Sequence, residues 1–303
     1  MIDYQSETDQ RAYIDFYVDE TYTSRWWMRR TPQTAKNQDV WRLDEVNLIL
    51  TSDRGLTNPT SQQQMVTGFS EQEPVIKEVD APDWCGGYQH GYDELSSISC
   101  TVYYYDATSE VVDLTSSGYV NPSKRAERVE FSQTETYYEH GTTTPWFNAT
   151  KVWKFSGYNQ VEQTTTMTAV RTANINTFYT AMFTPKYTLV NEGRRLNASG
   201  AYDYVDLSAN PVAFNEISGA TAEAASDVYS YDSNRLYKIQ VECLEGFGAQ
   251  QDPANTTYNN ANTRHFWIDT VNKPKSYHRQ GYTAINSGAS LSFKNRYSIA
   301  YKS

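Results

Sequence analysis

Apolar and polar residues alternate in short runs along most of the chain. Residues 11–18 place four apolar side chains on one side of an extended segment: Ala12, Ile14, Phe16 and Val18. Similar runs follow at 98–105, 128–133, 151–155, 236–244 and 291–301. A two-residue period is typical of strands with one buried face. The pattern therefore predicts a chain built mainly from short strands.

Turn-forming residues separate these runs, and helical patterns are rare. Residues 218–225 are the best candidate for a helix, and it is short. Residues 174–183 fit either a helix or a strand, and the threonines around them favour a strand. About a dozen short strands with turns between them indicate an all-β fold, a β-sandwich of jelly-roll or concanavalin-like type. We expect a single large domain over residues 1–303, with a possible seam near 190–200.

Residues 84–94 form a glycine-rich loop with the densest polar chemistry of the chain. His90 lies close in sequence to Asp93 and Glu94, so it could act as a general base or acid with a carboxylate fixing its tautomer. The same groups could bind a divalent metal or another ligand. Alternatively, the glycines only supply backbone angles for a tight turn, and His90 makes local hydrogen bonds. The sequence leaves these alternatives open.

Other candidate catalytic groups carry weaker signals. His278 lies between Tyr277 and Arg279, and a histidine near a tyrosine could serve a polysaccharide lyase. The acidic pairs 19–20 and 44–45 are interpreted as strand ends and solvated turns, because sequence does not give the separation that a glycosidase requires. No nucleophile elbow, phosphate-binding loop or dinucleotide-binding motif is present. We assign no catalytic residue, and His90, Glu94 and His278 are weak candidates.

Aromatic residues are the unusual feature of the composition, with 25 tyrosines and 7 tryptophans. Adjacent rings on a strand point to opposite faces, so Trp26 and Trp27 should place one ring in the core and one at the surface. Exposed tyrosines and tryptophans offer platforms for sugars or for other subunits. The expected ligand-binding residues are Trp84, His90, Asp93, Glu94, Tyr103 and Tyr105.

Charge and cysteine usage exclude several classes of partner. A net charge of -10 argues against nucleic acid, which needs a basic surface. No apolar run approaches the roughly 20 residues that cross a bilayer, so no membrane insertion is expected, and the first residues lack the pattern of a secretory signal. Cys85, Cys100 and Cys243 lack the spacing of a zinc site or a disulfide framework. We therefore expect no cofactor and no bound metal.

The motif Gly86-Gly87-x-x-His90-Gly91-x-Asp93-Glu94 resembles a Gly-Gly-x-His-Gly-Asp-Glu segment of bacteriophage tail-fibre and tail-associated proteins. The stretch that follows, through Trp146 to Phe183, is also similar, so the resemblance covers about residues 84–183. This chain has one added residue before His90, and Tyr92 separates Gly91 from Asp93. The resemblance implies a virion protein made in the bacterial cytoplasm. It also implies a homo-oligomer, often a trimer, bound to other virion proteins.

Three functions fit the sequence at this stage. The first is a phage tail protein of the fibre or receptor-binding type, which recognises bacterial surface glycan; this is what the resemblance implies. The second is a glycan lyase or hydrolase on the same scaffold, and the third is a purely structural capsid, neck or tail connector. Whether the protein is an enzyme stays open, with binding preferred.

Overall fold

The computed structural model confirms that the fold is all-β. It describes residues 2–6, 9–67, 74–118, 124–157, 159–186, 189, 192–196, 201–206, 227–231, 237–248, 250–264, 267–268 and 274–301. Across these residues nearly every element is a strand, joined by one short α-helix, α1 (Gly87–His90), and two single turns of 3-10 helix, η1 (Thr34–Lys36) and η2 (Thr51–Asp53). No helix of the described residues is both long and apolar enough to span a bilayer.

The first sheet, called here the N-terminal sheet, has the strand order β1-β2-β3-β5-β6. Its strands are β1 (Ile2–Ser6), β2 (Asp9–Tyr17), β3 (Tyr22–Arg30), β5 (Trp41–Leu50) and β6 (Gln62–Val66). All neighbouring pairs in it run antiparallel.

The second sheet, the large sheet, has the order β15-β14-β16-β17-β21-β12-β11-β10-β8-β4, and β9 pairs with β8 beside this path. Its central strands are long: β8 (Asp93–Tyr104), β10 (Ala126–Tyr138), β11 (Pro145–Ser156), β12 (Gln160–Ala169) and β21 (Ser290–Tyr301). The others are β4 (Gln38–Asp39), β9 (Ser109–Val111), β14 (Glu192–Leu196), β15 (Tyr202–Asp206), β16 (Asp227–Tyr231) and β17 (Tyr237–Glu245).

The third sheet has the order β18-β20-β13-β7, with β19 paired to β20. Its strands are β7 (Val75–Glu78), β13 (Ala173–Phe183), β18 (Thr256–Arg264), β19 (Trp267–Ile268) and β20 (Pro274–Ile285). Residues 174–183 therefore form a strand, as predicted.

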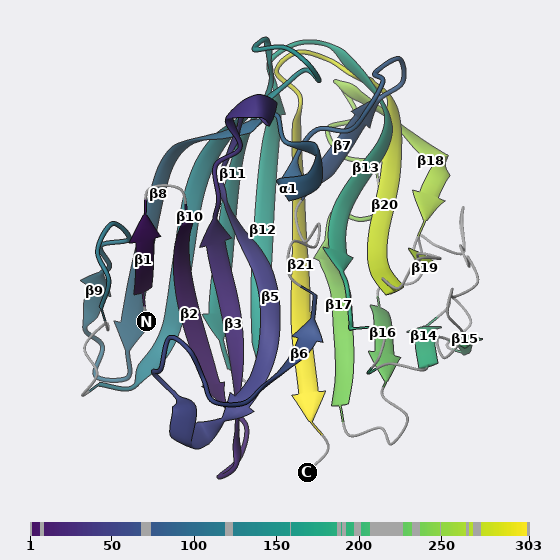
Figure 1. Ribbon diagram of the computed structural model, residues 1–303. Helices are drawn as coiled ribbons and strands as arrows, with labels where there is room; N and C mark the ends of the chain where they lie inside the picture. Colours follow the sequence, from purple (N-terminus) through teal and green to yellow (C-terminus); the bar gives the residue numbers. More distant parts are fainter. Residues whose placement is uncertain are drawn as a thin grey trace.

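The N-terminal sheet and the third sheet pack on different parts of the inner face of the large sheet (Figure 1). One apolar core joins Trp26 and Leu43 of the N-terminal sheet to Phe131 of the large sheet. A second core joins Phe178 of the third sheet to Phe293 of the large sheet. The fold is thus a layered β-structure whose large sheet is shared by two cores.

The structure tests the prediction for the two tryptophans, and two other predictions fall wholly or partly outside the described residues. Trp26 and Trp27 do face opposite sides, but Trp27 is only 9% exposed, because Tyr13 and Arg11 cover its ring. The expectation that one of the two rings lies at the surface is therefore wrong. The predicted helix at 218–225 lies outside the described residues, as does part of the possible seam near 190–200.

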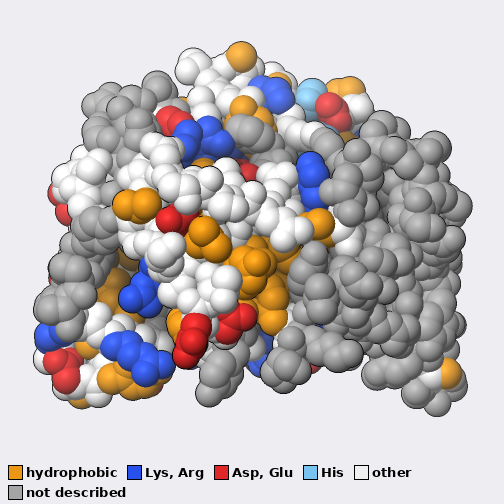
Figure 2. Space-filling view, turned by 60° about the horizontal axis from the view of Figure 1, so that its bottom comes forward, with side chains coloured by type: hydrophobic (Ala, Val, Ile, Leu, Met, Phe, Trp, Pro, Cys, Tyr) orange, Lys and Arg blue, Asp and Glu red, His pale blue; other side chains and the backbone are white. Residues whose placement is uncertain are grey.

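Some apolar side chains remain at the surface. Tyr17 and Tyr22 flank the turn between β2 and β3 and are 58% and 41% exposed. This turn lies at the bottom end of Figure 1, and Figure 2 shows hydrophobic side chains gathered on the face seen from that end, among acidic and basic ones.

Candidate functional site

A β-bulge in β5 turns two adjacent acids outward in the middle of a strand. Met28 of β3 is paired with Leu43, and Trp26 is paired with Val46, so Trp27 faces two residues, Asp44 and Glu45. A bulge of this kind inserts one extra residue and re-aims the side chains beside it. The interpretation of this acidic pair as a strand end or solvated turn is therefore wrong. The flanking apolar residues occupy the core, which leaves the acids on the outer face of the N-terminal sheet.

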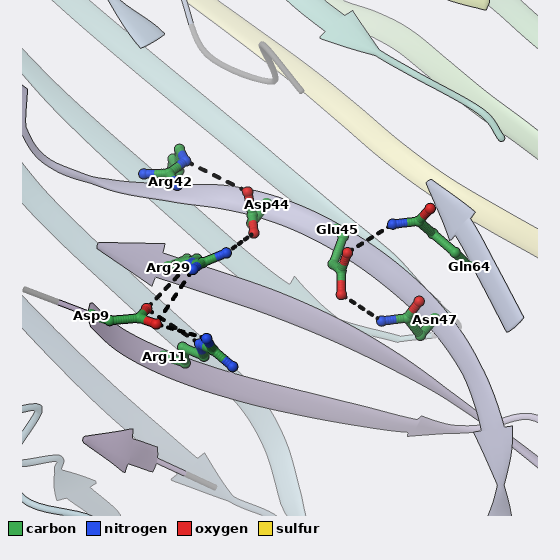
Figure 3. A network of polar contacts seen from close by, with 8 residues as sticks. All are labelled: Asp9, Arg11, Arg29, Arg42, Asp44, Glu45, Asn47 and Gln64. Atoms are coloured by element: carbon green, nitrogen blue, oxygen red, sulfur yellow. Dashed lines mark hydrogen bonds and ion pairs between the residues drawn. The ribbon is translucent and has the colours of Figure 1, made fainter. Parts of the chain in front are cut away.

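Asp44 lies between two arginines. Its carboxylate is 3.6 Å from Nη1 of Arg29 and 3.6 Å from Nε of Arg42, and its side chain is only 1% exposed (Figure 3). Arg42 is fully buried, while Arg29 is 15% exposed. A carboxylate with two guanidinium partners compensates charges that would be costly to bury alone.

The same network continues to the rim of the sheet. Arg29 binds Asp9 (Nε to Oδ1, 3.1 Å), and Arg11 binds the same carboxylate (Nη2 to Oδ2, 2.7 Å). Burial acts to raise the pKa of Asp9, but the hydrogen bonds and charges of the two arginines outweigh burial and lower that pKa. Asp9 and Arg11 are about one quarter exposed, so the network opens to solvent at this end.

Glu45 has a different environment from its neighbour. Two side-chain amides donate to it, from Nδ2 of Asn47 and Nε2 of Gln64, each at 2.8 Å (Figure 3). Burial raises the pKa of Glu45, and the nearby charge of Asp44 adds to the rise, while the amide hydrogen bonds oppose it. A raised pKa moves a carboxyl toward the range in which a general acid works.

The loop 84–94 closes one end of this network. Helix α1 places the ring of Tyr88 against the guanidinium of Arg42, 4.5 Å from the ring centroid. Nε2 of Gln33 donates to the carbonyl of Tyr88 at 2.7 Å and fixes the turn. The predicted glycine-rich loop therefore contacts Arg42, the partner of Asp44, through Tyr88, a residue not among the candidates.

The predicted site residues Trp84 and His90 lie together. Their ring centroids are 6.1 Å apart, and Trp84 also stacks on Tyr179 at 4.9 Å. Nδ1 of His90 is 3.5 Å from Oδ1 of Asp83, a carboxylate that was not among the candidates. This cluster is half-buried and could hold a flat ligand edge.

The remaining predicted residues have other surroundings. Asp93 is fully buried, and its Oδ2 accepts from the backbone N–H of Gly87 (3.2 Å), which holds the loop in place. Glu94 is exposed and accepts from the hydroxyl of Tyr138 at 2.9 Å. Tyr103 lies near the far end of β8, about 30 Å along the strand from Asp93, and Tyr105 comes just after the strand ends. They therefore do not join the loop in one site.

The remaining weak candidate, His278, is not tested by the structure. His278 pairs with Ala181 in the ladder between β13 and β20, but the structure does not describe its side chain. Another histidine, His265, lies outside the described residues. Within the described ranges, no group of three or more His, Cys, Asp or Glu side chains is placed to hold a metal ion. Burial raises the pKa of the Cys85 and Cys100 thiols to about 12, so neither is an activated nucleophile.

Sequence analysis missed Arg29, Arg42 and Tyr88 of this site and interpreted Asp44 and Glu45 as a strand end or turn. One signal was present. The apolar residues of β5 fall at 41, 43, 46 and 48, so the two-residue period slips by one position at the acidic pair. A slip of this kind inside a strand indicates a bulge, and a turn would instead end the period.

No protein-family model matches the sequence, and no curated protein matches it. Among solved structures, the chain is similar to the galactosidase domain of an alpha-galactosidase-sucrose kinase, with a TM-score of 0.48, 9% identity, and coverage of 99% of this chain and 42% of that one.

It is also similar to heparan sulfate lyase from Pedobacter heparinus (TM-score 0.41, 8% identity, 100% of this chain and 37% of that one). A third similar structure is a GalM/aldose epimerase homologue from C. elegans (TM-score 0.44, 10% identity, 97% and 100%). The chain thus spans about two fifths of the first two proteins. None of the three is a phage tail protein, and at these scores the comparisons carry no functional argument.

Proposed function

We propose that this protein binds a glycan on the outer face of its N-terminal sheet and hydrolyses a glycosidic bond there. The observation that carries the proposal is the contrast between two adjacent carboxyl groups. Burial raises the pKa of Glu45, while Asp44 lies between the guanidinium groups of Arg29 and Arg42. A carboxyl whose pKa is raised can supply the general acid that glycoside hydrolysis requires.

The two acids have separate roles in the proposed reaction. Glu45 donates its proton to the leaving glycosidic oxygen as the C–O bond breaks. Asp44 is buried between Arg29 and Arg42 and acts through its neighbour: its charge adds to the rise in the pKa of Glu45. Water then adds to the anomeric carbon, and its proton returns to Glu45.

The charges of the site favour a neutral glycan over an acidic one. The network contains three arginines (Arg11, Arg29 and Arg42) and three acids (Asp9, Asp44 and Glu45), so its formal charges cancel when Glu45 is ionised and sum to only +1 when Glu45 carries the proton that it donates. Paired charges and the amide of Gln64 present hydrogen-bond donors and acceptors in fixed positions, and sugar hydroxyls can use both kinds.

A hydrolysis assay tests the proposal. Purified protein is incubated with a panel of neutral and acidic polysaccharides, and new reducing ends are measured. We expect release from a neutral polysaccharide, a loss of at least about 100-fold in Glu45→Gln, and a decline in rate as pH rises through the raised pKa of Glu45. Glu94→Gln, in the loop first suggested by sequence, is the matched control and should keep its rate.

The outcomes separate the competing functions. Loss of rate in Glu94→Gln with none in Glu45→Gln would move the chemistry to the loop 84–94. Glycan binding by the wild-type protein without new reducing ends would leave a binding protein. Absence of both binding and hydrolysis across the panel would contradict the proposal.

The phage-tail hypothesis stays a prediction, together with the homo-oligomer, the virion partners, the virion location and the purely structural connector. Mass measurement in solution tests the oligomer, and a binding assay on bacterial cells tests host recognition. A monomer that does not bind cells would argue against a trimeric receptor-binding fibre.

A further inference from the structure

The inner face of the large sheet carries a row of polar side chains between its two apolar cores. The row crosses β10, β11, β12 and β21, and each of its members is at most 2% exposed: Gln133, Glu135, Lys151, Gln163, Thr165 and Asn295. Aromatic residues of the two cores lie on either side of it. Polar groups in such a position are retained only when hydrogen bonds satisfy them.

One end of the row is satisfied by side chains. Nζ of Lys151 is 2.6 Å from Oε1 of Glu135, and Nε2 of Gln133 donates to the other oxygen of that carboxylate at 2.7 Å. Gln133 also exchanges two hydrogen bonds with the backbone of Trp41, each 3.1 Å long. This end therefore joins the large sheet to the N-terminal sheet.

The other end differs. Nε2 of Gln163, Oγ1 of Thr165, Oδ1 of Asn295 and the indole Nε1 of Trp153 are buried and have no hydrogen-bond partner within the described part of the chain. The opposite atoms of the two amides are used: Oε1 of Gln163 accepts from Tyr297 (2.9 Å), and Nδ2 of Asn295 donates to the carbonyl of Thr180 (2.9 Å). Those bonds fix the orientation of both amides and so fix which atom is left over.

These four groups come from adjacent strands. Gln163 is paired in register with Trp153 on one side and with Asn295 on the other. Thr165 lies two residues further along the same strand, and so on the same face. Neighbouring positions of a sheet are about 5 Å apart across the strands, which is within reach of one bridging molecule.

The four groups offer N–H donors from Trp153 and Gln163 and oxygen acceptors from Asn295 and Thr165. An anion would need donors alone, and a cation would need oxygens alone. A water molecule accepts two hydrogen bonds and donates two. We infer that this end of the polar row is a binding site for internal water. At least one water molecule would join Asn295, which also contacts the third sheet, to the other polar groups at the centre of the large sheet.

An isosteric substitution gives the inference a test of sign. Thr165→Val removes the hydroxyl and keeps the shape and the β-branch. If the hydroxyl binds internal water, the substitution removes a hydrogen bond and lowers the urea midpoint. If the hydroxyl lies dry and unpartnered, removing it raises the midpoint.

Thr23→Val is the matched control, because Thr23 is also fully buried and its hydroxyl lies 3.1 Å from that of Thr51. We expect both variants to lower the midpoint by similar amounts. An unchanged or raised midpoint for Thr165→Val would overturn the inference.

A crystal structure of the wild-type protein tests it independently. The expected result is an ordered water within hydrogen-bond distance of both Thr165 and Gln163. A well-ordered site without density there would also overturn the inference.

Discussion

The outer faces of the N-terminal sheet and the large sheet differ in how far their polar side chains are exposed. On the large sheet, hydroxyls line up across neighbouring strands, as in the row Thr134, Thr150, Thr166 and Ser292. A shallow hollow of about 230 Å³ lies over these strands. Its polar lining is formed by Ser96, Thr134, Thr136, Asn148, Thr150, Thr166 and Thr168. On the N-terminal sheet, the outer face instead buries Arg42 and Asp44 almost completely.

The two faces have different physical costs. A threonine hydroxyl at the surface stays hydrated when the protein folds, and threonine favours an exposed strand. Buried charges lose their hydration, and pairing them regains only part of it. A face that keeps such charges departs from what stability alone favours, and such departures concentrate at functional sites. We therefore place the proposed chemistry on the N-terminal sheet and not over the hollow.

The largest expected effect concerns the glycine that holds α1 against the charged face. Gly86 has a φ of +92°, and a Cβ there would lie 2.5 Å from the carbonyl oxygen of Pro74 and 2.7 Å from the ring of Tyr137. Gly86→Ala should cost about 4 kcal/mol of unfolding free energy, from strain and overpacking together. Gly141 is the control, since its φ is +77° but the space around it is open. Gly141→Ala should cost about 1 kcal/mol. Equal losses in urea unfolding would show that the loop is not held by close packing.

The next effect compares the two faces directly. Asp44→Asn keeps the shape but removes the charge between Arg29 and Arg42, and should cost about 3 kcal/mol, because two guanidinium groups lose a buried partner. Thr150→Val on the outer face of the large sheet should change stability by less than about 0.5 kcal/mol. Urea unfolding of both variants measures the difference. Similar values would contradict the view that the charged face is the costly one.

A smaller effect is expected for the contact between Tyr88 and Arg42. Tyr88→Leu removes a ring from a buried guanidinium and should cost about 2 kcal/mol. Tyr105→Leu is the surface counterpart, because Tyr105 is 64% exposed and its ring centroid lies 5.2 Å from the guanidinium carbon of Arg125. That substitution should cost about 0.5 kcal/mol. If Tyr88→Leu costs no more than its counterpart, the loop does not support the acidic pair.

The smallest effect is a difference in pH dependence. Burial raises the pKa of Glu45 above 4.5, so its ionisation destabilises the fold as pH rises through the raised pKa, and Glu45→Gln should gain relative to wild type as pH rises. For Glu162 of the large sheet, burial opposes the shift, but Arg296 and Lys294 outweigh it and lower the pKa below 4.5. The stability from Glu162 is present above pH 4.5 and is lost as pH falls through the lowered pKa.

Glu162→Gln should therefore lose stability relative to wild type as pH rises, the opposite trend to Glu45→Gln. Unfolding free energies measured from pH 3 to pH 8 check both trends. Parallel trends would show that the two carboxyl groups do not have opposite environments.

The strands could be predicted from sequence because their signal is local. In β10, β12 and β21, burial of one face produces a two-residue period along the strand. The division into three sheets could not be predicted, because pairing joins distant segments. For example, β21 at the end of the chain lies between β12 and β17. No local sequence pattern shows which distant strand will be the pairing partner.

The site was predicted only in part. The loop 84–94 was found because glycines with positive φ and a histidine concentrate there, and Trp84 and His90 do lie together. Asp93 was a candidate ligand, but burial gives it a structural hydrogen bond to the loop backbone. Arg29 and Arg42 were not predicted, because the acids that they contact are brought to them by the strand pairing and by the bulge.

The bulge in β5 also makes the site sensitive to chain length. Deleting either Asp44 or Glu45 would restore unbroken alternation from Trp41 to Leu48, and the strand could then pair with β3 without a defect. Such a protein would keep its hydrophobic face and lose one of its two acids. A single codon in this strand thus decides between a regular strand and one that carries both acids of the proposed site.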